Sequence, residues 1–350
     1  MIRVWGKRIA LVLAILFLVL TVINAQWLAP TPRGYVKLVA HRGAHQLYDR
    51  AGLTRDSCTA NRIEVPVHDY LENTVAGMVQ AQRLGAQMIE VDVAPTADGQ
   101  IALFHDWTLD CRTNGKGEVR AATLAQLKAL DAGYGYTADG GKTFPFRGKG
   151  LGAIPSLAEA VQALPDRPLM FNFKSKNAAE ADQLAKALQA AGRDVEKVGD
   201  GFYGADAPIA RIRQLYPKAW AFSMGGAKAC TMDYLKYGWF TVVPESCRNG
   251  TLVIPLNRQW AFAGWPNKLI ERLEKVGARV VVVGPQGQGR DRGLTLPEEI
   301  GQVPSSFNGY VWVDDIWAVG PAMRPAYNKR NPVQEEELAK QLEARRKRYD

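Results

Sequence analysis

Several patterns that identify common protein classes are missing from this sequence of 350 residues. No Gly-rich nucleotide fingerprint follows the first expected strand, which argues against a dinucleotide-binding open sheet. The four cysteines form no CxxC pair and no zinc-ligand spacing, and no internal repeat is evident. The net charge is +9, but three of these charges belong to the first eight residues and three to residues 324–350. The remaining +3 is too small for a basic groove, so we expect no nucleic-acid partner.

The first 33 residues have the charge pattern of an export signal. Three basic residues among the first eight precede an unbroken apolar run, residues 9–23, and no further charge appears until Arg33. A signal sequence cleaved after Ala25 fits this pattern. A retained membrane anchor fits it as well, because the uncharged stretch 9–32 could span a bilayer of about 30 Å; a buried helix is the third possibility. We therefore expect an exported protein that is membrane-anchored, periplasmic or extracellular.

The last 25 residues, 326–350, are expected to form a charged helix outside the fold. Pro332 precedes a helical stretch from Gln334 to Tyr349, which ends in four consecutive basic residues, 345–348. A solvated helix is one interpretation. Attraction of the basic end to anionic lipid is the other.

Export into an oxidising compartment makes disulfides the natural state of Cys58, Cys111, Cys230 and Cys247. Four cysteines allow three connectivities. We favour pairing between sequence neighbours, Cys58 with Cys111 and Cys230 with Cys247, because each bridge would staple a segment that otherwise has the composition of a loop. Four separate thiols are the alternative.

Short β-rich runs alternate with helical stretches through the central segment, residues 34–325. Strands are expected at 36–40, 88–93, 101–105, 169–173, 201–203, 219–223, 279–283 and 310–313, several of them apolar on both faces as buried parallel strands are. Helices are expected at 74–84, 124–130, 157–164, 178–191, 208–215 and 266–276. This alternation predicts an α/β protein with a (β/α)8 TIM barrel, and a doubly wound open sheet is the competitor. Two long Gly-rich insertions, 44–71 and 133–153, are expected to shape a site.

Polar residues concentrate near the ends of the first four expected strands. They are His41 and Arg42 on the first, Glu90 and Asp92 on the second, His105 on the third, and Asn172 and Lys174 on the fourth. The carboxyl ends of barrel strands converge on one face. Glu90 and Asp92 point to the same side of their strand and would repel each other without a cation between them, which implies a hard divalent ion. Taken singly, each of these signals also fits a structural residue.

Two histidines near a phosphate would suit general acid and base catalysis. One proton must leave the attacking oxygen and another must reach the leaving alkoxide, so both His41 and His105 would have a role.

Taken together and in order, these motifs resemble those of the glycerophosphodiester phosphodiesterase family. The similar segments are Val39–Gly43, Glu72–Thr74, Gly85–Val93, Thr96–Gly99, His105–Asp106 and Arg112–Gly115. The resemblance covers residues 36–175 and is faint from 200 to 323, where the family's late Trp-Thr-Val-Asn type strand is not recognisable at 280–284. Extra residues between His41 and Glu72 and an aromatic loop at 133–150 lie outside the family pattern.

The resemblance implies metal-dependent hydrolysis of glycerophosphodiesters to glycerol 3-phosphate and an alcohol, in glycerophospholipid metabolism. The substrate would be a small phosphodiester or a lysophospholipid. The implied roles are general acid and base for His41 and His105, substrate binding for Arg42 and Lys174, and a Ca²⁺ or Mg²⁺ site for Glu72, Glu90, Asp92 and Asn172. Such enzymes usually act through the glycerol hydroxyl next to the phosphate, forming a cyclic phosphate that water then opens.

One residue departs from the family pattern. Asn172 stands where the family usually carries a third acidic ligand. An amide oxygen can still coordinate, but it supplies one negative charge less, so we expect a weaker Ca²⁺ or Mg²⁺ site. The alternative function is a catalytically weak or inactive phosphate- or lipid-binding protein of the cell envelope. A purely structural envelope protein is a third class, and it leaves the two histidines unexplained.

Overall fold

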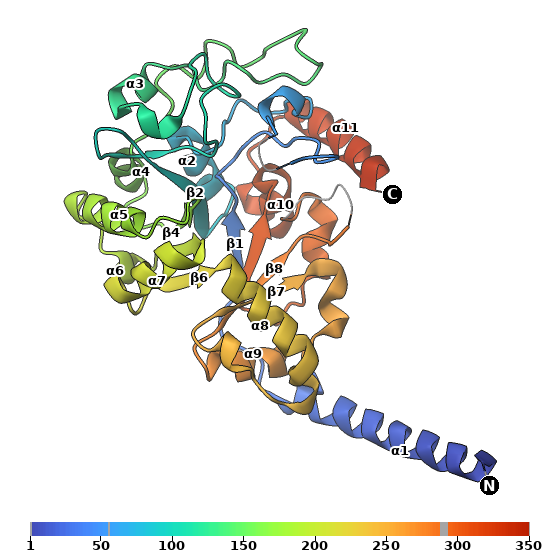
Figure 1. Ribbon diagram of the computed structural model, residues 1–350. Helices are drawn as coiled ribbons and strands as arrows, with labels where there is room; N and C mark the ends of the chain where they lie inside the picture. Colours follow the sequence, from blue (N-terminus) through green and yellow to red (C-terminus); the bar gives the residue numbers. More distant parts are fainter. Residues whose placement is uncertain (1, 55–56, 288–292, 350) are drawn as a thin grey trace.

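Eight parallel strands form a nearly closed barrel in the computed structural model, which describes residues 2–54, 57–287 and 293–349 (Figure 1). The strands are β1 (Lys37–Ala40), β2 (Met88–Pro95), β4 (Leu169–Phe173), β5 (Gly201–Gly204), β6 (Trp220–Ser223), β7 (Thr251–Pro255), β8 (Arg279–Val283) and β9 (Tyr310–Val313). Their backbones pair in the order β6-β5-β4-β2-β1-β9-β8-β7. A side-chain hydrogen bond joins β6 to β7, where Trp220 Nε1 donates to Thr251 Oγ1 at 2.9 Å. The predicted (β/α)8 architecture is confirmed.

Alternate residues of each strand belong to two apolar layers, and this alternation positions the site. Met88 and Met170 belong to the smaller apolar cluster, whereas Ile89 and Phe171 pack in the larger one with the surrounding helices. Because side chains alternate along a strand, Glu90 and Asp92 share the side of Met88, and Asn172 shares the side of Met170. The polar residues therefore continue the smaller cluster toward the carboxyl ends of the strands, where barrel enzymes carry their active sites.

One expected barrel strand is wrong, and one barrel strand was not predicted. Ile101–Leu103 (β3) pairs antiparallel with β2 and is not a barrel strand. Only residues 96–100 separate it from β2, too few for a parallel crossover, which needs about a dozen or more residues. The Asp98-Gly99 pair in this connection is a typical hairpin signal. The missing barrel strand is β7, which the sequence analysis did not identify.

The barrel is surrounded by helices (Figure 1). They are α2 (Val75–Arg83), α3 (Leu124–Lys128), α4 (Leu157–Ala163), α5 (Ala179–Ala190), α6 (Val195–Val198), α7 (Asp206–Leu215), α8 (Met224–Tyr237), α9 (Asn267–Glu274) and α10 (Ile316–Met323). Helices α6, α8 and α10 were not predicted from the sequence. Gly225 and Gly226 lie at the start of α8 and Pro321 lies inside α10, and both residue types lower helix propensity.

The C-terminal helix α11 (Pro332–Tyr349) packs against the body of the protein, so the expectation of a solvated tail is wrong. Leu338, Leu342 and Arg345 are buried and recur at the helical spacing that places them on one face. Arg345 forms ion pairs with Asp315 at 2.8 Å and with Glu64 at 2.7 Å. This helix therefore connects the first insertion to the segment that follows β9.

The N-terminal helix α1 (Ile2–Ile23) projects away from the barrel (Figure 1). Its segment Trp5–Ile23 is long and apolar enough to cross a membrane, by length and composition. The short helix η1 (Gln26–Leu28) follows it and leads toward β1.

Two disulfides join Cys58 to Cys111 and Cys230 to Cys247, the connectivity favoured from the sequence. The described residues contain no free cysteine. The first disulfide ties the insertion 44–71 to the segment after β3. The two insertions also pair with each other, since Thr137 N donates to Ala60 O at 2.9 Å.

Candidate active site

His41 follows β1, and a carboxylate fixes its orientation. Its Nδ1 lies 2.7 Å from Asp314 Oδ1, and its Nε2 lies 3.9 Å from Glu90 Oε2. Asp314 follows β9, where Gly293 N donates to its other oxygen at 2.9 Å. A carboxylate at Nδ1 favours the tautomer that carries its proton there and leaves Nε2 as the acceptor. Burial, partly offset by the charge of Asp314, lowers the pKa of His41 to about 3, so the imidazole is neutral at neutral pH.

Glu90 and Asp92 lie side by side on β2, and both are fully buried. Tyr203 OH donates to Glu90 Oε1 at 2.6 Å, and Arg42 N donates to Oε2 at 2.9 Å. Burial and the neighbouring charge of Asp92 raise the pKa of Glu90 to about 8. Burial by itself would raise the pKa of Asp92 as well. Nearby positive charge outweighs this effect, mainly that of Lys174, whose Nζ lies 3.6 Å from Asp92 Oδ1, and holds the pKa of Asp92 well below its usual range.

Amide side chains complete the surroundings of Asp92. Asn73 Nδ2 donates to Oδ2 at 3.0 Å, and Asn172 Nδ2 donates to Oδ1 at 2.8 Å. Asn73 also accepts a hydrogen bond from Asp92 N at 2.9 Å. Asn172 therefore points toward the site, as the sequence predicted, but it presents its amide nitrogen to the carboxylate.

The turn after β1 brings Arg42 into the site. Its φ of 58° lies in the left-handed region, which is uncommon for a residue other than glycine. This conformation lets its backbone N–H reach Glu90, while Nη1 lies 3.3 Å from Glu72 Oε1 and Nε lies 3.4 Å from Asp92 Oδ2. The next residue in this turn is Gly43. A larger residue is excluded there, because its Cβ would lie 2.9 Å from the backbone of Gly77 in α2.

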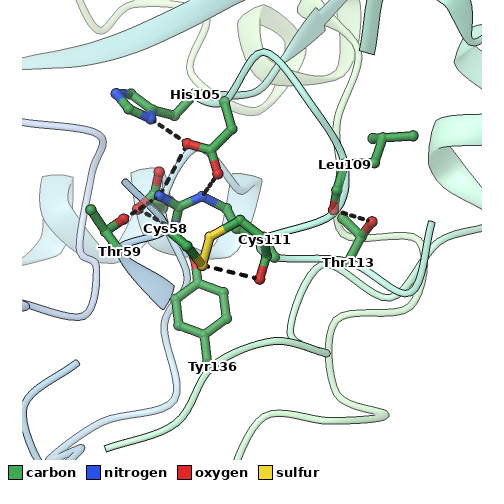
Figure 2. Close-up of a disulfide and its surroundings, with 10 residues drawn as sticks. Cys58, Thr59, His105, Leu109, Cys111, Thr113 and Tyr136 are labelled. Atoms are coloured by element: carbon green, nitrogen blue, oxygen red, sulfur yellow. Dashed lines mark hydrogen bonds and ion pairs between the residues drawn. A yellow bond between two sulfur atoms is a disulfide. The ribbon is translucent and has the colours of Figure 1, made fainter. Parts of the chain in front are cut away.

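His105 is oriented by a second carboxylate and a chain of ion pairs. Its Nδ1 lies 2.7 Å from Asp106 Oδ1, and Asp106 Oδ2 pairs with Arg112 Nε at 2.8 Å. Arg112 Nη1 pairs in turn with Glu72 Oε2 at 3.0 Å. Figure 2 shows His105 and Thr59 near the first disulfide. Arg112 Nη2 donates to Thr59 Oγ1 at 2.6 Å. The imidazole of His105 is partly exposed, and burial followed by the charge of Arg42 lowers its pKa.

The structure brings together every site residue predicted from the sequence, and the cysteines lie in the two disulfides. Five further residues of the site were not predicted from the sequence: Asn73, Asp106, Arg112, Tyr203 and Asp314. Three of these, Asn73, Asp106 and Arg112, lie inside the family-like segments, so a signal was present. Asp314 was missed because the family's late strand was sought at 280–284, around β8, whereas the residue that binds His41 directly follows β9.

The site can be tested for its fit to a divalent cation. Within the described residues, no three His, Cys, Asp or Glu side chains are arranged as a metal-binding group. Glu72 is held by two arginines. Glu90 and Asp92 nevertheless lie adjacent and fully buried, and burial followed by repulsion from Asp92 raises the pKa of Glu90. A hard divalent cation would relieve this repulsion, so the fit rests on Glu90 and Asp92.

The comparisons with known proteins point to one group of enzymes. The sequence model of the glycerophosphoryl diester phosphodiesterase family matches residues 41–216, half of the chain. A glycerophosphodiester phosphodiesterase of Caldanaerobacter subterraneus subsp. tengcongensis is 40% identical over 106 residues, which are 30% of this chain and 40% of that protein. The chain therefore aligns with less than half of the length of this curated relative.

Solved structures of such enzymes share the fold. A glycerophosphodiester phosphodiesterase from Agrobacterium tumefaciens superposes with a TM-score of 0.53 at 21% identity, covering 81% of this chain and 98% of that one. An Oleispira antarctica phosphodiesterase in complex with the product sn-glycerol-3-phosphate gives a TM-score of 0.52 at 18% identity, covering 83% and 97%. At these identities the likeness shows the fold alone.

Proposed function

Because the chain belongs to the glycerophosphoryl diester phosphodiesterase family, we propose that it hydrolyses glycerophosphodiesters to glycerol 3-phosphate and an alcohol. One observation carries the proposal. Two histidines, His41 and His105, each bind a carboxylate through Nδ1 and flank the buried pair of Glu90 and Asp92. The Oleispira antarctica phosphodiesterase, which shares the fold, was solved in complex with sn-glycerol-3-phosphate, the product proposed here.

In the first step, the glycerol hydroxyl next to the phosphate attacks phosphorus and the bond to the alcohol breaks. His41 takes the hydroxyl proton on Nε2, and Asp314 stabilises the resulting imidazolium. His105 gives a proton to the leaving alkoxide, and the anionic substrate favours its protonated form. Water then opens the cyclic phosphate with the two roles reversed. Arg42 and Lys174 bind phosphate oxygens and orient the diester.

A Ca²⁺ or Mg²⁺ ion would be held by Glu90 and Asp92 and would neutralise charge on the phosphate and the attacking oxygen. Glu90 would lose its proton on binding, because the cation compensates the repulsion that raises its pKa. Asn172 and Glu72 would act around this pair, Asn172 through Asp92 and Glu72 through the two arginines.

The alternative of a binding protein without activity rests on Asn172 alone. Asn172 retains a hydrogen bond to Asp92, and both pairs of histidine and carboxylate are intact, which supports an active enzyme. The proposed location is outside the cytoplasm, and the two disulfides and the apolar helix α1 support it.

The direct test is release of glycerol 3-phosphate from glycerophosphocholine and glycerophosphoethanolamine, with and without chelator. His41→Ala and His105→Ala should each lower turnover by about 10²–10⁴, the usual contribution of a general acid or base. His68→Gln is the matched control, since His68 packs between Tyr70 and Trp317 and contacts none of the site residues named above. Near wild-type turnover in either alanine variant would refute the assignment.

A further inference from the structure

The end of helix α1 is part of the folded body of the protein. Asn24, directly after α1, is 6% exposed, and its Nδ2 donates to Trp239 O at 2.9 Å. Arg272 of α9 is 8% exposed; its Nη1 donates to Asn24 Oδ1 at 2.7 Å, and its Nη2 donates to Ile23 O at 3.4 Å. Cleavage after Ala25 would remove both acceptors and leave a buried guanidinium with fewer partners, which is costly. These contacts favour a retained helix over a cleaved signal.

Exposed apolar side chains neighbour the residues of this junction, Asn24 and Trp239, along the chain. Trp27 and Leu28 of η1 are 72% and 44% exposed. On either side of Trp239, Tyr237 at the end of α8 is 51% exposed, and Phe240 and Val242 in the segment that follows α8 are 57% and 52% exposed. We refer to these five side chains as the apolar collar. A patch of this kind marks an interaction surface, and Trp and Tyr are the residues enriched where a protein meets the membrane interface.

The apolar collar lies at the end of the barrel opposite the active site. η1 precedes β1, the segment after α8 precedes β7, and α9 precedes β8, so all three belong to the amino ends of strands. The catalytic side chains belong to the carboxyl ends, and β1 alone rises about 13 Å from Lys37 to His41. Figure 1 shows α1 leaving the molecule beside α8 and α9, away from the end that carries the two insertions.

We propose that α1 is retained as a membrane anchor, that the apolar collar rests on the bilayer surface where α1 enters it, and that the active site faces away from the membrane toward water-soluble glycerophosphodiesters. The occupant of the apolar collar is a lipid bilayer because the collar is continuous with a helix that is itself long and apolar enough to span one. The choice of substrate class rests on the proposed function.

In this orientation, lipids that stay in the bilayer cannot reach the active site as substrates. A lysophospholipid would have to leave the membrane to reach the carboxyl ends of the strands. Each acyl CH₂ that must leave the bilayer lowers the equilibrium constant for extraction of the lipid by about fourfold, so a long chain holds its head group at the membrane surface. A deacylated glycerophosphodiester has no such barrier and diffuses to the site.

Site-directed fluorescence tests the orientation independently of activity. The full chain is inserted into phosphatidylcholine vesicles that contain head-group spin-labelled lipid. One cysteine is introduced, by Phe240→Cys or by Lys142→Cys, and a fluorophore is attached to it. The added thiol is the one that reacts, because the described native cysteines are all in disulfides. Both positions are exposed; Phe240 belongs to the apolar collar and Lys142 to the second insertion. We expect quenching at Phe240→Cys and none at Lys142→Cys. Equal quenching, or quenching only at Lys142→Cys, would overturn the orientation, as would a mature mass that shows cleavage after Ala25.

The same vesicles test the substrate class. Glycerophosphocholine in solution should be hydrolysed faster than lysophosphatidylcholine in the bilayer, by about tenfold or more given the cost of extracting the chain. His41→Ala measures contaminating hydrolases. Equal rates with both substrates would overturn the substrate class while the proposed function stood. Hydrolysis of neither would refute the proposed function and the substrate class with it, and the fluorophores would still decide the orientation.

Discussion

Asp314 offers the sharpest test of the proposed chemistry, because its carboxylate would act on the reaction through His41. The distance of 2.7 Å between Nδ1 and Oδ1 places the charge centres of an imidazolium and a carboxylate about 4 Å apart, where the attraction is about 4 kcal/mol at an effective dielectric constant of 20. The two side chains are 7% and 2% exposed, so solvent screens this attraction little. Since about 1.4 kcal/mol corresponds to a tenfold change in rate, Asp314→Asn should lower kcat by up to about 10³.

The assay is kcat and KM for glycerophosphocholine across pH, on protein whose unfolding transition is checked. A positioning role predicts a large fall in kcat with little change in KM, because the attraction develops only when His41 takes up the proton. Asp200→Asn is the control: its buried side chain accepts from Leu169 N and pairs with Arg193 at 2.8 Å, so it affects the fold without touching the imidazole. If the two variants lost kcat equally, or Asp314→Asn lost none, the role of Asp314 would be refuted.

Three further predictions follow from other parts of the structure. Asn172→Glu should lower the half-saturating concentration of Ca²⁺ or Mg²⁺, because a carboxylate adds charge beside Asp92; an unchanged value would show that position 172 does not act on the cation. Replacing Cys58 and Cys111 by Ser should lower kcat as well as thermal stability, because that disulfide adjoins Thr59 and Arg112, whereas serines at the other disulfide should affect stability alone; equal activities would contradict this. Burial lowers the pKa of His68 to about 4, below its unfolded value of about 6.5. The free energy of unfolding should therefore fall by about 3 kcal/mol between pH 6.5 and pH 4, because the unfolded chain takes up a proton that the folded one does not. If His68→Gln showed the same dependence of the unfolding free energy on pH, this prediction would be disproved.

The fold class was accessible from the sequence because buried parallel strands leave a strong apolar signal, as in β2 and β4. The errors arose where strand identity depends on connection length. The segment 101–103 has the composition of a barrel strand but returns as a hairpin. The packing of α11 was also beyond prediction, since Arg345 has the appearance of a solvated charge until its partners Asp315 and Glu64 are known.

The site was predictable where its residues lie close to one another in the first half of the chain. His41, Glu90, Asp92 and His105 all belong to segments with recognisable order. Asp314 could not be paired with His41 in the same way, because 273 positions separate them and only barrel closure places β9 beside β1, with Val313 opposite Ala40. Contacts of this kind depend on tertiary topology and leave no local pattern.

The two histidines differ in how the protein orients them, and this difference bears on which parts of the chain the chemistry needs. Asp106, the partner of His105, is held by Arg112, which binds Thr59 beside the first disulfide, so the orientation of His105 depends on the insertion. Asp314, the partner of His41, is followed directly by Asp315, which is held by Arg345 of α11. Each imidazole is thus supported from outside the barrel strands, once by the insertion and once by the C-terminal helix. A truncated barrel without these two elements would keep both histidines and lose part of what orients each of them.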